Sequence, residues 1–179
     1  MIMFRTILTN NTKWSILMFI FFSACVNPFA PKLTDQDPNS KLILTEQKSP
    51  EDVLTNFSFA YTFKDSLVYS DVLDSSFLFL SKDYSTDPVT NLSWGRDIDI
   101  KTTIGMFRHF QSLNLVWERT SSKVYRNEDS TIVELAQNFK LTLDGGNEIP
   151  TINGIAKFIF IKKRSGIWKI TRWEDESTF

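Results

Sequence analysis

The sequence predicts an α+β domain in which three N-terminal helices pack on one face of a curved, mostly antiparallel sheet. Apolar residues recur with helical spacing in the first part of this domain, and they alternate with polar residues after Ser112. The expected helices are segregated from the long strands instead of alternating with them, which is typical of α+β folds rather than of βαβ units. Short turns that contain glycine separate the last strands, as expected for antiparallel neighbours.

Two helices open the domain. Ser49-Pro50-Glu51-Asp52 combines an N-cap serine, a proline at the first helical position and acids in the first turn. Apolar residues follow at helical spacing as far as Tyr61. Asp65 is the expected cap of a second, shorter helix that includes Leu73.

A buried strand over residues 77–80 and a third helix follow. Asp97 is expected to open this helix, and its apolar stripe ends at Phe110. Alternation then predicts strands over 113–118, 133–143, 155–162 and 167–174, of which the second carries Gln137 on its apolar face.

The first thirty residues have the features of an export signal. Arg5 and Lys13 are the only charges in this stretch, and an apolar run over residues 14–22 follows them. That run is far shorter than the roughly 20 residues that a spanning helix needs. Cys25 comes next, and it is the only cysteine, so the chain can form no internal disulfide.

The segment Phe22-Ser23-Ala24-Cys25 resembles the bacterial lipobox, although Leu is usual where Phe22 stands. The resemblance implies that the thiol of Cys25 receives a diacylglyceryl group and that Cys25 becomes the new N-terminus, which attaches the chain to a membrane. Val26, rather than Asp, follows the cysteine, and by resemblance to the enterobacterial sorting rule this favours the outer membrane of the cell envelope. An ordinary signal peptide with an incidental cysteine is the alternative.

These features divide the chain into three parts. Residues 1–24 are the expected signal peptide, 25–48 a lipidated cysteine with a proline-containing tether, and 49–179 the folded domain. Leu42-Ile43-Leu44 interrupts the polar tether, and the sequence leaves open whether this triplet docks on the domain or moves freely.

Charge and composition exclude several functions. The chain has 20 basic and 21 acidic residues, and without Arg5 and Lys13 the mature part has 18 basic residues. This mildly acidic balance argues against nucleic-acid binding, and the run Lys162-Lys163-Arg164 is interpreted as a solvated turn. His109 is the only histidine, so a zinc site is not expected, and no cofactor is predicted.

The order of elements resembles the nuclear transport factor 2-like superfamily, which includes the SnoaL-like polyketide cyclases and ketosteroid isomerase. The similarity implies a cone with a pocket between helices and sheet, but it implies no reaction, since the fold serves enzymes, binders and scaffolds. It covers about residues 49–177, and the stretches that carry it are 50–63, 65–79, 94–110, 154–160 and 166–175.

Five residues are candidates for the pocket: Gln137, His109, Tyr61, Trp117 and Trp173. His109 could act as a general base or lie at the helix boundary, and Gln137 could contact a ligand or a structural partner. The tryptophans fit either the core or a ligand platform. Tyr61, Tyr69, Asp71 and Asp74 are of the types that a ketosteroid-isomerase mechanism uses, but no acid interrupts the expected apolar face of the long strands.

The sequence therefore favours a membrane-anchored envelope lipoprotein with a non-catalytic domain that binds a small hydrophobic ligand or a protein. A small isomerase or cyclase is the alternative, and it requires a histidine or carboxylate inside the pocket. A structural partner in an envelope complex is the third hypothesis, and a large exposed apolar patch would favour it.

The strand over 155–162 is apolar on both faces. Phe158 and Phe160 alternate with Ile159 and Ile161, yet the helices are expected to cover one face alone. We therefore expect either the tether or a second copy of the sheet to cover the isoleucines. Dimers through this surface are frequent in the superfamily that the chain resembles, which favours a homodimer.

Overall fold

The computed structural model describes residues 44–83, 87–146 and 149–178. They lie within one unit, Leu42–Phe179. The predicted signal peptide, Cys25 and the tether up to residue 43 lie outside the described residues.

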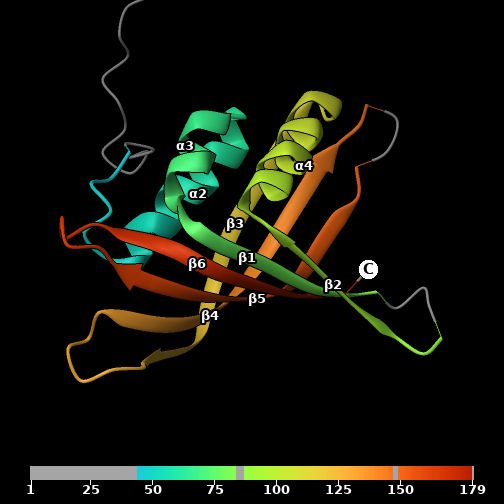
Figure 1. Ribbon diagram of the computed structural model, residues 1–179. Helices are drawn as coiled ribbons and strands as arrows, with labels where there is room; N and C mark the ends of the chain where they lie inside the picture. Colours follow the sequence, from blue (N-terminus) through green and yellow to red (C-terminus); the bar gives the residue numbers. More distant parts are fainter. Residues whose placement is uncertain (1–43, 84–86, 147–148, 179) are drawn as a thin grey trace, which may run out of the picture. The chain divides into compact units, whose positions relative to one another are not determined.

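Three helices pack on one face of a six-stranded sheet (Figure 1). The strands lie in the order β2-β1-β6-β5-β4-β3, and all neighbours are antiparallel except β1 and β6. The predicted α+β fold, with helices on a curved and mostly antiparallel sheet, is confirmed. The elements are α2 (Pro50–Phe63), α3 (Ser66–Val72), β1 (Leu73–Asp83), β2 (Thr90–Gly95), α4 (Arg96–His109), β3 (Ser112–Tyr125), β4 (Ile132–Asp144), β5 (Thr151–Lys162) and β6 (Trp168–Thr178).

The first two helices begin where the sequence predicted. The side chain of Ser49 accepts from the backbone N–H of Asp52 at 3.1 Å, and the carboxylate of Asp52 accepts from the N–H of Ser49 at 3.2 Å, which completes a capping box. Asp65 caps α3 through the N–H groups of Leu67 and Val68. These side chains satisfy backbone donors that have no partner within the first turn of a helix.

Other predicted boundaries were wrong. The cap of α4 is Gly95, so this helix begins before Asp97, and α3 ends before Leu73, which is the first residue of β1. β2 was not predicted from the sequence; it pairs along β1 from Leu78↔Gly95 to Asp83↔Thr90. Most of β2 is exposed, so it lacks the apolar alternation by which strands are recognised.

Aromatic rings fill the space between the helices and the sheet. Phe57 of α2 lies at the centre of this core, with its ring centroid 5.3 Å from Tyr69 and 5.9 Å from Phe158. All three side chains are buried. Trp168 and Ile170 of β6 are buried as well, so they share the face of the strand that packs on the helices.

The pairing of β1 with β6 is interrupted near its start. Leu73 pairs with Ile170, and the next pair is Leu78 with Arg172. Residues 74–77 of β1 are therefore not paired with β6, and we call this segment the arch. A second irregularity lies at Thr171 of β6, which is skipped in the pairing of β6 with β5. Irregularities of this kind bend a strand and redirect its side chains, and here they shape the groove described below.

The first described residues are attached to the domain by hydrogen bonds. The backbone N–H of Thr45 donates to Oδ1 of Asn56 at 2.8 Å, and Nδ2 of Asn56 donates to the carbonyl of Thr45 at 3.1 Å. The carbonyl of Gln47 accepts from the N–H of Trp168 at 2.8 Å. Residues 45–47 thus pack on the domain although the sequence placed them in the tether, whereas Leu44 is 46% exposed.

Candidate functional site

The cone contains a cavity of about 20 Å³. Three of the five predicted pocket residues, Tyr61, Trp117 and Trp173, line it together. A volume of this size accommodates about one water molecule, because a single water needs roughly 10–15 Å³ of such space. The lining residues are Phe57, Tyr61, Leu115, Trp117, Phe139, Leu141, Ala156 and Trp173.

Few polar atoms reach this cavity. Nε1 of Trp117 donates to the carbonyl of Leu54 at 2.8 Å, so this indole N–H is already satisfied. Nε1 of Trp173 is buried and has no partner within the described part of the chain. Burial, followed by the negative charges of Asp99 and Asp175, raises the pKa of Tyr61, which keeps its hydroxyl protonated.

The other two predicted pocket residues lie elsewhere. Gln137 is buried, and its amide is satisfied by β3: Oε1 accepts from Oγ1 of Thr120 at 2.8 Å, and Nε2 donates to the carbonyl of Glu118 at 2.9 Å. His109 is exposed on the last turn of α4, with its ring perpendicular to that of Phe110. Neither side chain lines the cavity.

A buried carboxylate that the sequence analysis did not single out lies under the helices. Asp99 of α4 is 3% exposed, and it accepts from the hydroxyl of Tyr69 at 2.5 Å and from Nε1 of Trp94 at 2.9 Å. Burial raises the pKa of Asp99 more than these two hydrogen bonds lower it. The three residues come from α4, α3 and β2, so their proximity depends on the tertiary fold.

A second acid lies on the inner face of the sheet. Asp175 of β6 pairs with Ala156 of β5, whose side chain is fully buried in the core, and its charge acts on Tyr61. The expectation that no acid interrupts the apolar face of the long strands was therefore wrong. In the sequence Asp175 stands between Glu174 and Glu176, and such an acidic run predicts a solvated position.

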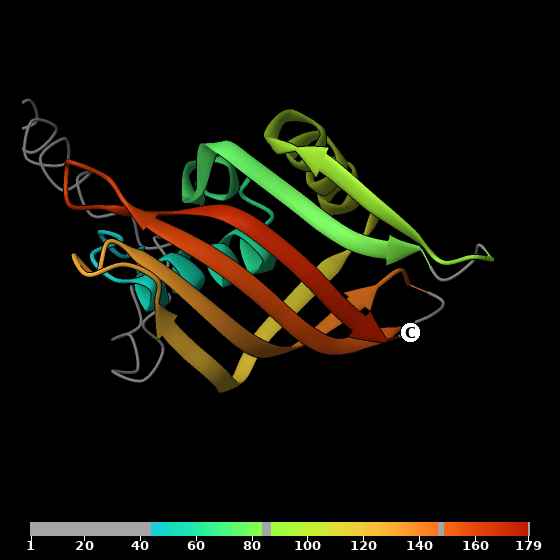
Figure 2. The same ribbon diagram turned by 60° about the horizontal axis from the view of Figure 1, so that its bottom comes forward.

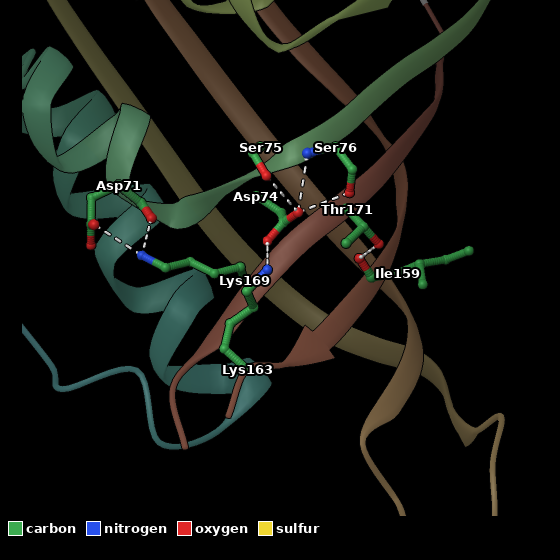
Figure 3. Close-up of polar contacts among 8 residues, drawn as sticks. All are labelled: Asp71, Asp74, Ser75, Ser76, Ile159, Lys163, Lys169 and Thr171. Atoms are coloured by element: carbon green, nitrogen blue, oxygen red, sulfur yellow. Dashed lines mark hydrogen bonds and ion pairs between the residues drawn. The ribbon is translucent and has the colours of Figure 1, made fainter. Parts of the chain in front are cut away.

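A larger open space lies outside the cone, beside the arch of β1. This groove has a volume of about 570 Å³, and four parts of the chain form it: α3 with the start of β1, the first residue of α4, the turn between β5 and β6, and the first part of β6. Figure 3 shows Asp71, Asp74, Ser75, Lys163 and Lys169 of this lining. The lining residues are Leu67, Ser70, Asp71, Leu73, Asp74, Ser75, Arg96, Lys163, Ser165, Ile167 and Lys169.

Asp74 organises the arch. Its Oδ2 accepts from Nζ of Lys163 at 2.6 Å, and its Oδ1 accepts from the backbone N–H and the hydroxyl of Ser76 at 3.0 and 2.8 Å (Figure 3). Burial alone would raise the pKa of Asp74, but these hydrogen bonds outweigh burial and lower it to about 2. The carboxylate is therefore ionised at neutral pH and has donors on both of its oxygens.

Asp71 holds the second lysine of the groove. Its Oδ1 lies 2.9 Å from Nζ of Lys169, which also donates to the backbone carbonyl of Asp71 (Figure 3). Its Oδ2 accepts from Nε2 of Gln47 at 2.5 Å. Burial opposes the shift, but the hydrogen bonds from Lys169 and Gln47 lower the pKa of Asp71.

The third cation of the groove is Arg96, the first residue of α4. Its Nη2 donates to the carbonyl of Ser70 at 2.8 Å, which fixes the guanidinium against the last turn of α3. Its Nε is buried without a partner, and no carboxylate of the described residues lies within 4.0 Å of it. In the sequence Asp71 and Asp74 stood out only as types that a ketosteroid-isomerase mechanism uses, and nothing there indicated Arg96.

Metal ligands do not gather in the described ranges: no three His, Cys, Asp or Glu side chains there form a group that could hold an ion.

None of the helices in the described ranges combines the length and apolar character needed to cross a bilayer.

Solved structures show the same fold at low sequence identity. A candidate aromatic ring hydroxylase from Novosphingobium aromaticivorans is 16% identical, with a TM-score of 0.59, and the match covers 75% of this chain and 90% of that chain. A candidate scytalone dehydratase from the same organism is 14% identical, with a TM-score of 0.58 over 72% of this chain and 81% of that one. A candidate dehydratase of the nuclear transport factor 2-like family from Streptomyces avermitilis is 12% identical, with a TM-score of 0.54 over 71% and 91%.

These similarities define the class of the domain by its fold. The described residues form the nuclear transport factor 2-like cone that the sequence resemblance implied. No protein-family model and no curated protein matches the sequence. Since the fold serves many functions, what the domain does has to be argued from its own side chains.

Proposed function

We propose that the chain is a bacterial envelope lipoprotein, held on the membrane by lipid on Cys25, whose domain binds a ligand or a partner protein without catalysing a reaction. The observation that carries the second part is the distribution of open space. The cavity in the cone has about 20 Å³, whereas the groove beside the arch has about 570 Å³. Ligand sites generally fall between roughly 300 and 1,000 Å³.

The groove supports binding rather than catalysis. Both of its carboxylates are ionised acceptors whose oxygens already have donors, from Lys163 and Ser76 at Asp74 and from Lys169 and Gln47 at Asp71. A general base needs a carboxylate oxygen within hydrogen-bond reach of the substrate proton. Groups committed in this way position a ligand better than they transfer protons.

The anchor is supported by the sequence alone. The lipobox-like segment ends at Cys25, and 18 residues separate this cysteine from Leu44, where the described residues begin. A chain of that length spans at most about 65 Å when extended. The domain would thus remain close to the membrane surface and could still reach partners in the envelope.

Lipid labelling tests the anchor. With labelled palmitate in the growth medium, the full chain should take up label and fractionate with membranes. Cys25→Ser should take up none and should leave the membrane fraction or remain unprocessed, because the chain has no other cysteine. Ser23→Ala, which keeps a small residue before Cys25, is the matched control and should behave like the wild type. An unlabelled wild-type chain would contradict the lipoprotein assignment.

A small pocket enzyme of the isomerase or cyclase type is the second candidate function, and two acids near the cone cavity favour it. Asp99 bonds to Tyr69 beneath the helices, and Asp175 acts on Tyr61 at the cavity wall. Solved proteins with the same fold include candidates for a dehydratase and a hydroxylase. This function requires the cavity to open far enough to admit a substrate beside Tyr61.

A further inference from the structure

The charges that line the groove do not balance. Three cations line it, Arg96, Lys163 and Lys169, against two carboxylates, Asp71 and Asp74. Each lysine forms an ion pair with one carboxylate, at 2.9 Å for Lys169 and 2.6 Å for Lys163. The lining therefore has one net positive charge, and Arg96 carries it.

Neither carboxylate can turn to Arg96 without losing donors it already has. Asp74 accepts from Lys163 on one oxygen and from Ser76 on the other, and Asp71 accepts from Lys169 and Gln47. The charge of Arg96 does reach Asp71, since it contributes to the lowered pKa of that carboxylate. The lining of the groove therefore has one carboxylate fewer than it has cationic side chains.

Arg96 is also held in place for an incoming acceptor. The bond from Nη2 to the carbonyl of Ser70 holds the guanidinium beside the groove, and the buried Nε donates to no atom of the described residues. The planar fork of arginine matches a carboxylate through two parallel hydrogen bonds.

We propose that the groove binds a ligand that ends in a free carboxylate, with Arg96 as its anchor. The rest of the lining suits a short, partly apolar body. Ser70, Ser75 and Ser165 offer hydroxyl groups, and Leu67 and Ile167 offer apolar surface. This inference rests on the proposed binding function and assigns it a ligand class. Two sources share this chemistry, an N-acylated amino acid and the C-terminus of a protein chain.

Titration of the full chain in detergent micelles tests the ligand class. The probes are N-acetyl-leucine, an acetylated pentapeptide that ends in leucine with a free carboxylate, the C-terminal amides of both, and inorganic phosphate. The readout is the Nε–H resonance of Arg96 in a ¹H–¹⁵N spectrum. Both carboxylates should shift this resonance in a saturable way, while the amides should not. Phosphate also fits the arginine fork, but it has no apolar body for Leu67 and Ile167 and should bind more weakly. Tighter binding by the pentapeptide would assign the ligand to a protein C-terminus, and equal binding would assign it to the small molecule.

Substitutions show whether Arg96 is the anchor. Arg96→Gln should weaken carboxylate binding about tenfold or more, because a charge-assisted pair of hydrogen bonds is lost. Arg96→Lys should also weaken it, since lysine keeps the charge but not the fork. Arg108→Gln, an exposed position on the last turn of the same helix, is the matched control and should bind like the wild type.

Three results would overturn the proposal. They are equal shifts with acids and amides, equal shifts with phosphate, or unchanged binding by Arg96→Gln in a chain whose amide spectrum shows it folded. The titration does not depend on the lipid. If the chain takes up palmitate but no carboxylate shifts the Arg96 resonance, the ligand class is rejected and the proposed lipid anchor on Cys25 still stands. Saturable shifts confined to the N–H of Trp173 would place binding in the cone and reject the groove itself.

Discussion

Asp74 is the residue on which the shape of the groove depends most. Its side chain is 7% exposed, and it connects the arch of β1 to Lys163 in the turn between β5 and β6. Its pKa is lowered from 3.8 to about 2, so the folded state favours the ionised form. The resulting stability is fully present above about pH 4 and is lost as the pH falls through 3.8 toward 2.

Asp74→Asn tests this contribution. At pH 7 the variant should unfold with a free energy about 2 kcal/mol below that of the wild type, from the size of the pKa shift. The difference should shrink between about pH 4 and pH 2 in denaturant titrations followed by circular dichroism. Asp129→Asn, in an exposed turn, is the control. A difference that stays constant across this pH range would show that the ion pair is not its source.

The contacts of some residues could be anticipated from the sequence, and those of others could not. The sequence left two alternatives for Gln137, and the structure resolves them in favour of structural satisfaction by Thr120 and Glu118. The sequence did not indicate a role for Asp99 or Arg96, because the hydrogen-bond partners of each residue come from other helices and strands. Sequence periodicity reports which face a residue lies on, but not which distant side chain meets it.

At the scale of elements, strongly patterned segments were predictable. The capping box of α2, the Asp65 cap of α3 and the alternating faces of β4 all follow from local chemistry. β2 was missed because it lies mostly exposed at the edge of the sheet, where no core selects for alternation. α4 starts at Arg96 instead of Asp97 because Gly95 is its cap, without a side-chain hydrogen bond.

The arch of β1 was the least predictable element. It requires residues 74–77 to leave the register with β6 while Leu73 and Leu78 stay paired. The sequence shows only Asp-Ser-Ser followed by an apolar run, which indicates the start of a strand equally well. The arch depends on Lys163, almost 90 residues along the chain, to hold Asp74.

For the whole molecule, the order of helices and strands was sufficient to predict the cone fold, because segregated elements leave few ways to cover one face of a sheet. In this fold the helices cover only one face of the sheet. Figure 2 shows the other face, which no helix covers. Ile155, Ile159 and Ile161 of β5 alternate with inward residues and are half-buried. Thr45 and Gln47 hydrogen-bond to α2 and α3, on the helix side, and the tether up to residue 43 lies outside the described residues.

We propose that a second copy of the chain covers this face. The detergent-extracted chain should then sediment as two chains per particle when the micelle is matched by solvent density. Ile159→Lys should give one chain per particle without unfolding the domain, because the side chain points away from the core. Thr102→Lys adds the same charge at an exposed position of α4, on the helix side of the sheet, and should remain dimeric. One wild-type chain per particle would reject the dimer.

The central claim is that the domain binds outside its cone, because aromatic side chains fill the interior. The most direct measurement is a titration of the ¹⁵N-tryptophan-labelled full chain with indole, a neutral aromatic molecule far larger than the cavity of about 20 Å³. The account predicts that the side-chain N–H resonances of Trp117 and Trp173, which line that cavity, show no saturable shift up to the solubility limit of indole. Saturable shifts at both tryptophans would show that the cone opens to admit a ligand. They would contradict binding outside the cone and would favour a functional pocket inside it.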